Sequence, residues 1–277
     1  MEFRIILGDI TKVKADAIVN AANNSLLGGG GVDGAIHRAA GSRLLEECRQ
    51  LNGCETGEAK ITKGYNLPAK YVIHTVGPIW SGGNNGGERL LANCYMNSLK
   101  LAEEYKCRYV AFPSISTGVY NFPFDKASKI AVRTIMEYCI GKHVIDNVEM
   151  VCFDEKTKGY YSEALKDFLI KRLIFICTPE NRNKCNNETG LISIINSIAY
   201  VYGLESLGDY GKYIEMSGRA IDNNAEMADQ LDLNTTIATL ICILREQYWD
   251  GGWSDTIGSR ISNGQMIKLV NRLKEIG

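Results

Sequence analysis

The feature that most constrains the fold of this chain is an alternation, between Phe3 and about Glu155, of short apolar runs with longer segments of helical period. Short apolar runs are typical of strands buried on both faces, and a period of three to four residues is typical of amphipathic helices. Strands and helices that alternate along a chain favour an α/β domain with helices on both faces of a central sheet. We therefore predict a layered α/β domain for the first part of the chain.

The predicted elements of this domain follow from residue type and period. The strands are rich in Val, Ile, Tyr and Phe; they are Phe3–Leu7, Ala17–Asn20, Tyr71–Val76, Tyr109–Pro113 and Val148–Phe153, with a weaker strand at Lys60–Thr62. The helices carry apolar residues three and four positions apart; they are Ala35–Gln50, Glu88–Lys106, Asp125–Gly141 and Tyr160–Leu173. Together these elements predict one domain that ends near residue 176.

The composition changes at Cys177–Glu188, a polar segment that lacks periodicity and contains a proline and several asparagines. Such a segment is typical of a linker between domains. After it the pattern is helical, with helices predicted at Thr189–Tyr202, Asn224–Gln230, Asn234–Tyr248 and Asn263–Ile276. We therefore divide the chain into an α/β domain (residues 1–176), a linker (177–188) and a small all-α domain (189–277).

Charge and cysteine content narrow the classes of function. The 31 Lys and Arg residues nearly balance the 32 Asp and Glu residues, which disfavours nucleic-acid binding because that needs a broad positive field. The nine cysteines include no C-x-x-C pair, a pattern that favours free thiols in a reducing compartment. The segment Met1–Gly8 lacks a signal-peptide pattern, and no apolar run reaches membrane-spanning length. We therefore expect a cytoplasmic protein with no membrane partner.

The densest chemical signal is the segment Asn20–Gly34, whose four consecutive glycines lead from a predicted strand into a predicted helix. Glycines let main-chain N–H groups approach an anion closely, and a helix N-terminus adds unpaired donors and the positive end of its dipole. This arrangement indicates a phosphate or diphosphate site. The spacing Gly29-x-Gly31-x-x-Gly34 also fits the dinucleotide fingerprint. No second strand ending in an acidic residue follows, which argues against a nicotinamide oxidoreductase.

A second candidate anion loop, Pro113–Pro123, also lies between a buried strand and a predicted helix, and it carries Ser116, Thr117 and Gly118. In an α/β sheet, ligands bind beyond the carboxyl ends of the strands, so two such loops could hold a diphosphate from both sides. Either loop alone is more often an ordinary turn, because Gly and Ser are common turn residues. The presence of both in one chain favours the anion site.

These motifs resemble the signature of the MacroD-type macrodomains. The resemblance is carried by Leu7-Gly-Asp9-Ile-Thr11, Ala17-Ile-Val-Asn20-Ala-Ala-Asn23, Gly28–Gly41, Thr56-Gly57-Glu-Ala, Leu67–Pro78 and Ile115–Tyr120. It covers roughly residues 1–173, and it implies a three-layer α/β/α macrodomain with a mixed central sheet that binds ADP-ribose. One position departs from the pattern: Asn121 stands where the family usually has a glycine. Asparagine also tolerates left-handed backbone angles.

The resemblance implies a ligand contact for each of several residues. Asp9 would bind the adenine amino group beside the backbone N–H of Ile10, and Phe153 would stack on the base. Without the resemblance, an Asp in this sequence more often closes a turn or caps a helix. The remaining contacts, mainly backbone donors to the diphosphate, would come from Gly31, Val32, Ser116, Thr117, Gly118, Val119 and Tyr120. Tyr120 would also cover the distal ribose.

The resemblance further implies a catalytic pair, Asn23 and Asp33, at the positions that hold the distal ribose and the attacked bond. Asp33 would orient or deprotonate water, and Asn23 would donate a hydrogen bond to a ribose oxygen. The implied reaction is water attack on an ADP-ribosyl ester, on either a mono-ADP-ribosylated Asp or Glu of a protein or O-acetyl-ADP-ribose. We expect no cofactor and no metal, because the three histidines, His37, His74 and His143, show no ligand spacing.

Two other classes of function remain open. A binding-only reader of ADP-ribose would have the same diphosphate loops, but the pair Asn23 and Asp33 favours an enzyme. The helical tail, which resembles a helical domain of unknown function from bacterial proteins, could bind a protein partner. Its aromatic segment Tyr248–Trp253 could form a recognition surface, although aromatic residues near helix ends more often belong to a core.

Overall fold

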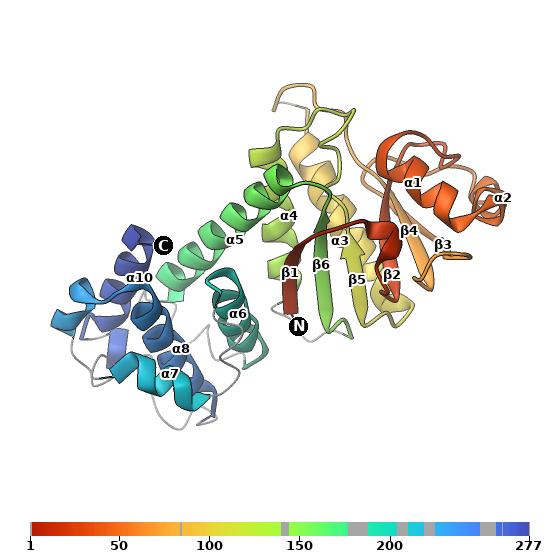
Figure 1. The fold of residues 1–277 in the computed structure, drawn as a ribbon. Coiled ribbons are helices and arrows are strands. Elements are labelled where there is room, and N and C mark those ends of the chain that lie inside the picture. The colour runs from red at the N-terminus through yellow and green to blue at the C-terminus, as the bar shows by residue number, and fades with distance from the viewer. Residues whose placement is uncertain are drawn as a thin grey trace. The chain divides into compact units, whose positions relative to one another are not determined.

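The computed structural model describes residues 2–83, 85–139, 144–176, 188–203, 210–218, 225–249, 259–261 and 263–276. The chain forms two compact units, Met1–Ala164 and Leu165–Gly277, both drawn in Figure 1. The boundary between them falls inside helix α5 (Glu155–Ile176). The predicted linker lies outside the described residues except for Glu188, which begins helix α6 (Glu188–Val201). The domain limits at residues 176 and 189 therefore stay a prediction.

The first unit is built on a six-stranded sheet. Its strands are β1 (Glu2–Leu7), β2 (Ala17–Ala22), β3 (Ala59–Lys63), β4 (Tyr71–Val76), β5 (Tyr109–Phe112) and β6 (Asn147–Cys152). They are arranged in the order β1-β6-β5-β2-β4-β3. All neighbouring strands are parallel except β3, which is antiparallel to β4. The mixed sheet is confirmed, and five strands end at the same edge.

The apolar runs form strands because helices cover both faces of the sheet. In β2, all residues from Ala17 to Asn20 are fully buried. Helices α1 (Gly31–Ala40) and α2 (Ser42–Gln50) pack on one face, over β2 and β3, and α3 (Gly87–Glu104) packs against β3 and β4 from the other. Figure 1 shows α4 (Phe124–Cys139) beside α3 on that second face. Burial of these apolar side chains, at roughly 25 cal/mol per Å², stabilises the three layers.

The helix predicted at Ala35–Gln50 is wrong in two respects. The chain forms two helices there, because Gly41 has a φ of 85° that interrupts the helical backbone between them. A Cβ at this position would also lie only 2.8 Å from Nδ2 of Asn66, so glycine is required on two counts. In addition, α1 begins at Gly31 rather than Ala35, which places Asp33 in its first turn.

The described residues of the second unit are helical, as predicted. Its elements after α6 are α7 (Tyr210–Ser217), the 3₁₀ helix η4 (Ala225–Gln230), α8 (Leu233–Trp249) and α10 (Gln265–Ile276). Residues Thr236–Leu244 of α8 are all buried, because α6, α7 and α10 pack around that helix. The sequence pattern did not predict α7. Residues 250–258, which include most of the predicted aromatic segment, lie outside the described residues.

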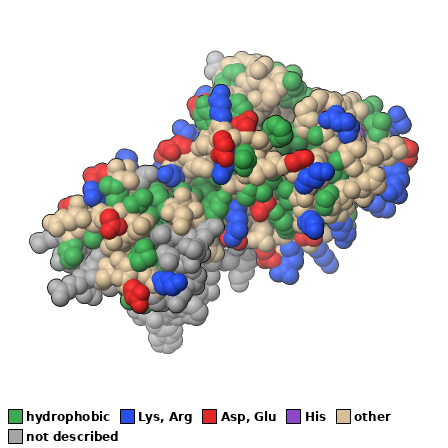
Figure 2. Space-filling model, in the orientation of Figure 1, with side chains coloured by type: hydrophobic (Ala, Val, Ile, Leu, Met, Phe, Trp, Pro, Cys, Tyr) green, Lys and Arg blue, Asp and Glu red, His purple; other side chains and the backbone are tan. Residues whose placement is uncertain are grey.

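The surface carries both signs of charge. Figure 2 shows acidic and basic side chains interspersed on the visible face, in agreement with the balanced composition. Among the described residues, no helix is both long and apolar enough to cross a membrane. Among the described residues, Cys48, Cys54, Cys94, Cys107 and Cys152 are buried free thiols, and Cys242 is also buried.

Candidate functional site

The fold brings the predicted site residues to one edge of the sheet. Asp9 follows β1, Phe153 follows β6, the second anion loop follows β5 and the glycine loop follows β2. These four strands are parallel neighbours in that order, so their carboxyl ends all meet at this edge. Ligands of open α/β sheets bind there. All predicted contacts therefore lie along one line, with Asp9 at one end and Asn23 at the other.

The glycine loop is held by side chains at its start and by close packing at its end. Nδ2 of Asn23 donates to the carbonyl oxygen of Gly28 at 2.9 Å, and Oδ1 of Asn23 accepts from the N–H and hydroxyl of Ser25. At the other end, a Cβ on Gly34 would lie 2.4 Å from the carbonyl oxygen of Gly29. Only glycine at position 34 allows the loop to rest this closely on α1.

The two predicted catalytic side chains approach the same point. A Cβ on Gly29 would lie 3.0 Å from Oδ2 of Asp33 and 3.3 Å from Nδ2 of Asn23. The main-chain N–H groups of Gly31 and Val32 belong to the first turn of α1, where N–H groups have no partner within the helix. A carboxylate, an amide and unpaired backbone donors are thus gathered within a few residues of the glycine loop.

Asp33 is a buried carboxylate with one oxygen left unpaired. Its relative exposure is 4%. Oδ1 accepts a hydrogen bond of 2.7 Å from Nδ2 of Asn20 and lies 3.4 Å from Nε2 of His37. Burial raises the pKa of Asp33, although Asn20 and His37 act in the opposite direction. Oδ2 is buried and has no hydrogen-bond partner among the described residues, and this is the oxygen that faces Gly29.

Behind Asp33 lies a buried cluster of His37, Cys48 and His74, whose ligand-type atoms lie within 4.8 Å of one another. Sequence spacing did not predict this cluster, because the fold brings together residues of α1, α2 and β4. Both ring nitrogens of His74 already have partners, Asn20 at 3.1 Å and Thr62 at 2.9 Å. Burial raises the pKa of Cys48 to about 12 and lowers that of His74 to about 3.

The geometry of this cluster therefore fits a network of neutral hydrogen-bonding groups better than a set of metal ligands, since a thiol that binds metal must be deprotonated. His74 is completely buried and His37 is partly buried, whereas the sequence predicts each only as a packed or surface residue. His143 lies outside the described residues.

The second anion loop has a constrained backbone. Ser116 has a φ of 66°, and its buried hydroxyl oxygen has no partner among the described residues. Non-glycine residues with positive φ are uncommon and cluster at binding sites. The loop approaches the end of β4 so closely that a Cβ on Gly77 would lie 2.1 Å from Oγ of Ser116. Asn121 also has a positive φ, 52°, as expected for a residue in the place of a glycine.

At the far end of the edge, the side chain of Asp9 makes hydrogen bonds within the protein, whereas the side chain of Phe153 is exposed. Oδ1 of Asp9 accepts from the N–H of Thr11 at 2.9 Å and from its hydroxyl at 2.7 Å, which caps the 3₁₀ helix η1 (Ile10–Lys12). These hydrogen bonds lower the pKa of Asp9. The prediction that Asp9 caps a helix is therefore confirmed. Only Oδ1 of Asp9 takes part in the cap, and Oδ2 does not. Phe153 is 86% exposed, so its ring is available for stacking.

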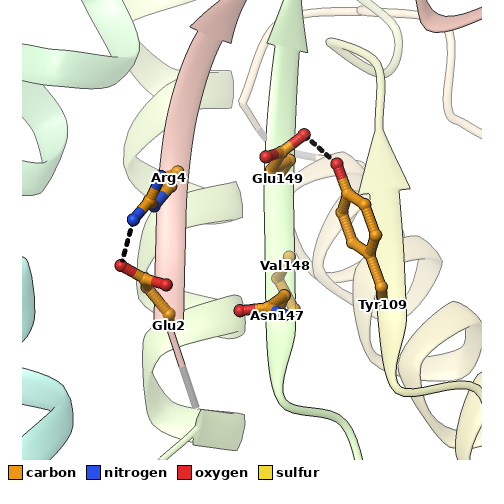
Figure 3. Close-up of a pocket in the computed structure, with 6 residues that line it drawn as sticks. All are labelled: Glu2, Arg4, Tyr109, Asn147, Val148 and Glu149. Atoms are coloured by element: carbon orange, nitrogen blue, oxygen red, sulfur yellow. Dashed lines mark hydrogen bonds and ion pairs between the residues drawn. The ribbon is translucent and has the colours of Figure 1, made fainter. Parts of the chain in front are cut away.

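Of two pockets in the described part of the chain, one lies at the opposite edge of the sheet from this line of residues and the other borders the glycine loop. Figure 3 shows a pocket of about 210 Å³ lined by Glu2, Arg4, Tyr109, Asn147, Val148 and Glu149. These residues begin β1, β5 and β6, so this pocket lies at the opposite edge of the sheet. A second pocket, of about 420 Å³, is lined by Leu27, Gly28, Gly29, Gly34, His37, Arg38, Gly41, Ser42 and Leu45. It lies between the glycine loop and the outer side of α1 and α2.

Comparison with known proteins identifies the first unit. Residues 19–131 match the family model described as the Macro domain. A macro domain-containing protein of Chlorobaculum tepidum is 61% identical over 160 residues, which are 58% of this chain and 93% of that protein. The chain belongs to the macro domain family. The resemblance on which the sequence prediction rested is confirmed.

Two further relatives of this macro domain are informative. ADP-ribose glycohydrolase MACROD2 of Homo sapiens is 58% identical over 163 residues, which are 58% of this chain and 38% of that protein. The solved structure described as the Oceanobacillus iheyensis macrodomain with ADP superposes with a TM-score of 0.58 at 48% identity. That superposition covers 60% of this chain and 91% of the other.

Sequence reasoning missed two residues that contact the predicted machinery of this macro domain. The sequence pattern predicts no role for Asn20, but its amide donates a hydrogen bond to Asp33. It predicts His74 as a packed or surface residue, but Nδ1 of His74 lies 3.1 Å from the amide nitrogen of Asn20. A signal existed for His74, because it is the one ionisable residue in the otherwise apolar centre of Val72–Val76. A buried histidine in such a run must find hydrogen-bond partners.

Proposed function

We propose that this macro domain binds ADP-ribose and hydrolyses ADP-ribosyl esters, releasing mono-ADP-ribose from Asp or Glu side chains or acetate from O-acetyl-ADP-ribose. The observation that carries the proposal is the approach of Asp33 and Asn23 to one point beside Gly29 in the glycine loop, while the second anion loop follows the neighbouring strand β5. The descriptions of the relatives agree with it: one is an ADP-ribose glycohydrolase and another a macrodomain with ADP.

The order of the strands suits an elongated ligand. Neighbouring strands lie about 4.8 Å apart, so the line from β1 to β2 spans roughly 15 Å. In the proposed mode of binding, Oδ2 of Asp9, the N–H of Ile10 and the ring of Phe153 hold the adenine at one end. The diphosphate lies between the two loops. It is held by residues at the start of α1 and in the second anion loop, which are Gly31, Val32, Ser116, Thr117, Gly118, Val119 and Tyr120. The distal ribose then lies at Asn23 and Asp33, covered by Tyr120.

The proposed chemistry uses Asp33 as the group that activates water. The water oxygen forms a bond to the acyl carbon of the ester, and its proton passes to Oδ2 of Asp33. The bond between that carbon and the ribose oxygen then breaks, and the ribose oxygen takes the proton from Asp33, which gives ADP-ribose and the free carboxylic acid and restores the carboxylate. A carboxylate whose pKa is raised by burial is a stronger base than an exposed one. Nδ2 of Asn23 has a second hydrogen beyond the one given to Gly28, and this hydrogen is available to a ribose oxygen.

The test is calorimetric titration of the chain with ADP-ribose, followed by incubation with a protein that carries labelled mono-ADP-ribose on Asp or Glu. We expect binding and release of the label. Binding without release, on this substrate and on O-acetyl-ADP-ribose, would identify a reader module instead. An absence of binding would contradict the ligand assignment itself.

The domain limits, residues 1–176 and 189–277, are part of the same proposal. Limited proteolysis should cut within residues 177–188 and leave a fragment that still binds ADP-ribose. Cuts that start within residues 1–176 would contradict these limits.

A further inference from the structure

A chain of buried polar side chains runs from the proposed base across three strands of the sheet. It begins at Asp33 on α1 and continues through Asn20 on β2 and His74 on β4 to Thr62 on β3. Asn20 and His74 are opposite each other in the parallel register of β2 and β4. Both are completely buried, and Thr62 is 2% exposed. Four polar residues in a core need a reason, because a buried polar atom without a hydrogen-bond partner carries a desolvation cost. Two atoms of this chain, Oδ1 of Asn20 and Oδ2 of Asp33, are buried and have no hydrogen-bond partner among the described residues.

The direction of each hydrogen bond follows from the carboxylate at one end. An ionised Asp33 can only accept, so Nδ2 of Asn20 donates to it at 2.7 Å. The same Nδ2 lies 3.1 Å from Nδ1 of His74, so Nδ1 accepts the second amide hydrogen. The neutral ring then carries its proton on Nε2, which donates to Oγ1 of Thr62 at 2.9 Å. Both hydrogens of the Asn20 amide are thereby used.

Without the lone pair on His74, one N–H of the Asn20 amide would be unpaired in the core. The amide would then be held only by its hydrogen bond to Asp33, because Oδ1 of Asn20 has no partner among the described residues. We propose that His74 is a positioning residue: it fixes the Asn20 amide with its nitrogen toward Asp33, and so fixes the orientation and basicity of that carboxylate. This inference rests on the proposed function, in which Asp33 activates water.

Removal of the His74 acceptor should shift the pKa of Asp33 as well as lower kcat. The hydrogen bond from Asn20 favours the charged form of Asp33 and lowers its pKa. Loss of that bond should therefore raise the pKa of Asp33 and move the acid limb of the pH–rate profile to higher pH. The other titratable groups that face this site are His37 on α1 and Cys48 on α2, and both are left intact in the variants below.

Two substitutions of His74 separate positioning from packing. His74→Asn keeps an oxygen acceptor near the place of Nδ1 but leaves a cavity. His74→Leu fills the space better but offers no acceptor. We expect the Asn variant to keep kcat within about threefold, and the Leu variant to lose roughly tenfold to a hundredfold in kcat at nearly unchanged KM, as when outer groups that orient site ligands are removed. A packing role predicts the reverse order, with activity following stability.

The control is Thr75→Val, in the neighbouring buried residue on the opposite face of β4, whose hydroxyl donates to the carbonyl of Glu58. It should lower the melting temperature and leave the pH–rate profile in place. If His74→Leu does not fold, Thr62→Val replaces it, since it removes the acceptor for Nε2–H. Its effect should have the same direction and be smaller, because the Cys48 sulfur lies 3.7 Å from Nε2 as a weak alternative.

The pKa of Asp33 is read directly, by ¹³C NMR titration of its carboxyl carbon in each variant. This readout does not depend on turnover, so it still decides the role of His74 if the wild-type chain proves to be a reader without hydrolase activity. A raised Asp33 pKa in His74→Leu (or Thr62→Val), with a near wild-type value in His74→Asn, supports the inference. An unchanged Asp33 pKa in the variants that remove the acceptor, or equal shifts in the Leu and Asn variants, overturns it.

Discussion

Gly34 lies so close to the carbonyl oxygen of Gly29 that a Cβ at position 34 would be 2.4 Å from it. This contact fixes the height of the glycine loop above α1, and therefore the position of Gly29 beside Asp33 and Asn23. The four consecutive glycines Gly28–Gly31 are the clearest glycine motif in the sequence. In the structure, however, the close contact at Gly34 determines the position of that loop relative to α1. Two glycines of this region, Gly34 and Gly30, should therefore respond very differently to substitution.

We expect Gly34→Ala to lower the free energy of unfolding by about 1–3 kcal/mol, as overpacking does, and to weaken ADP-ribose binding because the loop must move outward. Gly30→Ala is the matched control: its φ is −92°, and a Cβ there would meet no atom within 4 Å. Thermal unfolding and calorimetry on both variants would check this. Equal effects of the two substitutions would show that the loop adapts to position 34.

Asp33→Asn should separate binding from turnover. The substitution keeps the shape of the side chain and removes the base, so kcat should fall by about 10²–10⁴. The Kd for ADP-ribose should change little, because in the proposed mode of binding the diphosphate contacts come from backbone donors. The measurement is single-turnover release of labelled ADP-ribose alongside calorimetry. Retained turnover would remove Asp33 from the catalytic role.

The pH dependence of stability should also report on Asp33. Burial raises its pKa in the folded protein, so between its ordinary pKa and the raised one the folded state binds more protons than the unfolded state. The free energy of unfolding attributable to Asp33 must therefore fall as pH rises through that window. Comparison of the wild-type chain with Asp33→Asn by denaturant titration at several pH values isolates this contribution. The variant should gain stability relative to wild type as pH rises.

The strands and the binding edge could be predicted from the sequence, because buried strands of an α/β sheet are apolar on both faces and strand ends carry the loops. The start of α1 could not, because Gly34 has poor helix propensity and packs against the loop, and Gly31 enters the helix with a left-handed φ of 58°. Nor could the contact of Asn20 with His74, since it depends on β2 pairing with β4 across 54 positions of sequence. Helix α7 has only eight residues, about two turns, so its period is too short to detect in the sequence.

Asn121 allows a test of the second anion loop. Its φ of 52° is unstrained for glycine, moderately unfavourable for asparagine and strained for β-branched residues. Asn121→Gly should leave stability within about 1 kcal/mol and keep or tighten ADP-ribose binding. Asn121→Val should cost about 1–2 kcal/mol of stability and weaken binding. A collapse of affinity in Asn121→Gly, measured by calorimetry, would mean that the asparagine side chain itself contacts the ligand.

Phe153 tests which end of the site holds the adenine. Its side chain is 86% exposed at the end of β6, so Phe153→Ala should leave the melting temperature nearly unchanged. If the ring stacks on adenine, the substitution should cost about 1–2 kcal/mol of binding, roughly tenfold in Kd for ADP-ribose. Ribose 5-phosphate, which has no adenine, is the matched ligand, and its affinity should not respond. If both ligands lose affinity equally, Phe153 stabilises the binding loops and does not stack on adenine. The proposed placement of adenine near β1 and of the distal ribose near β2 would then be wrong.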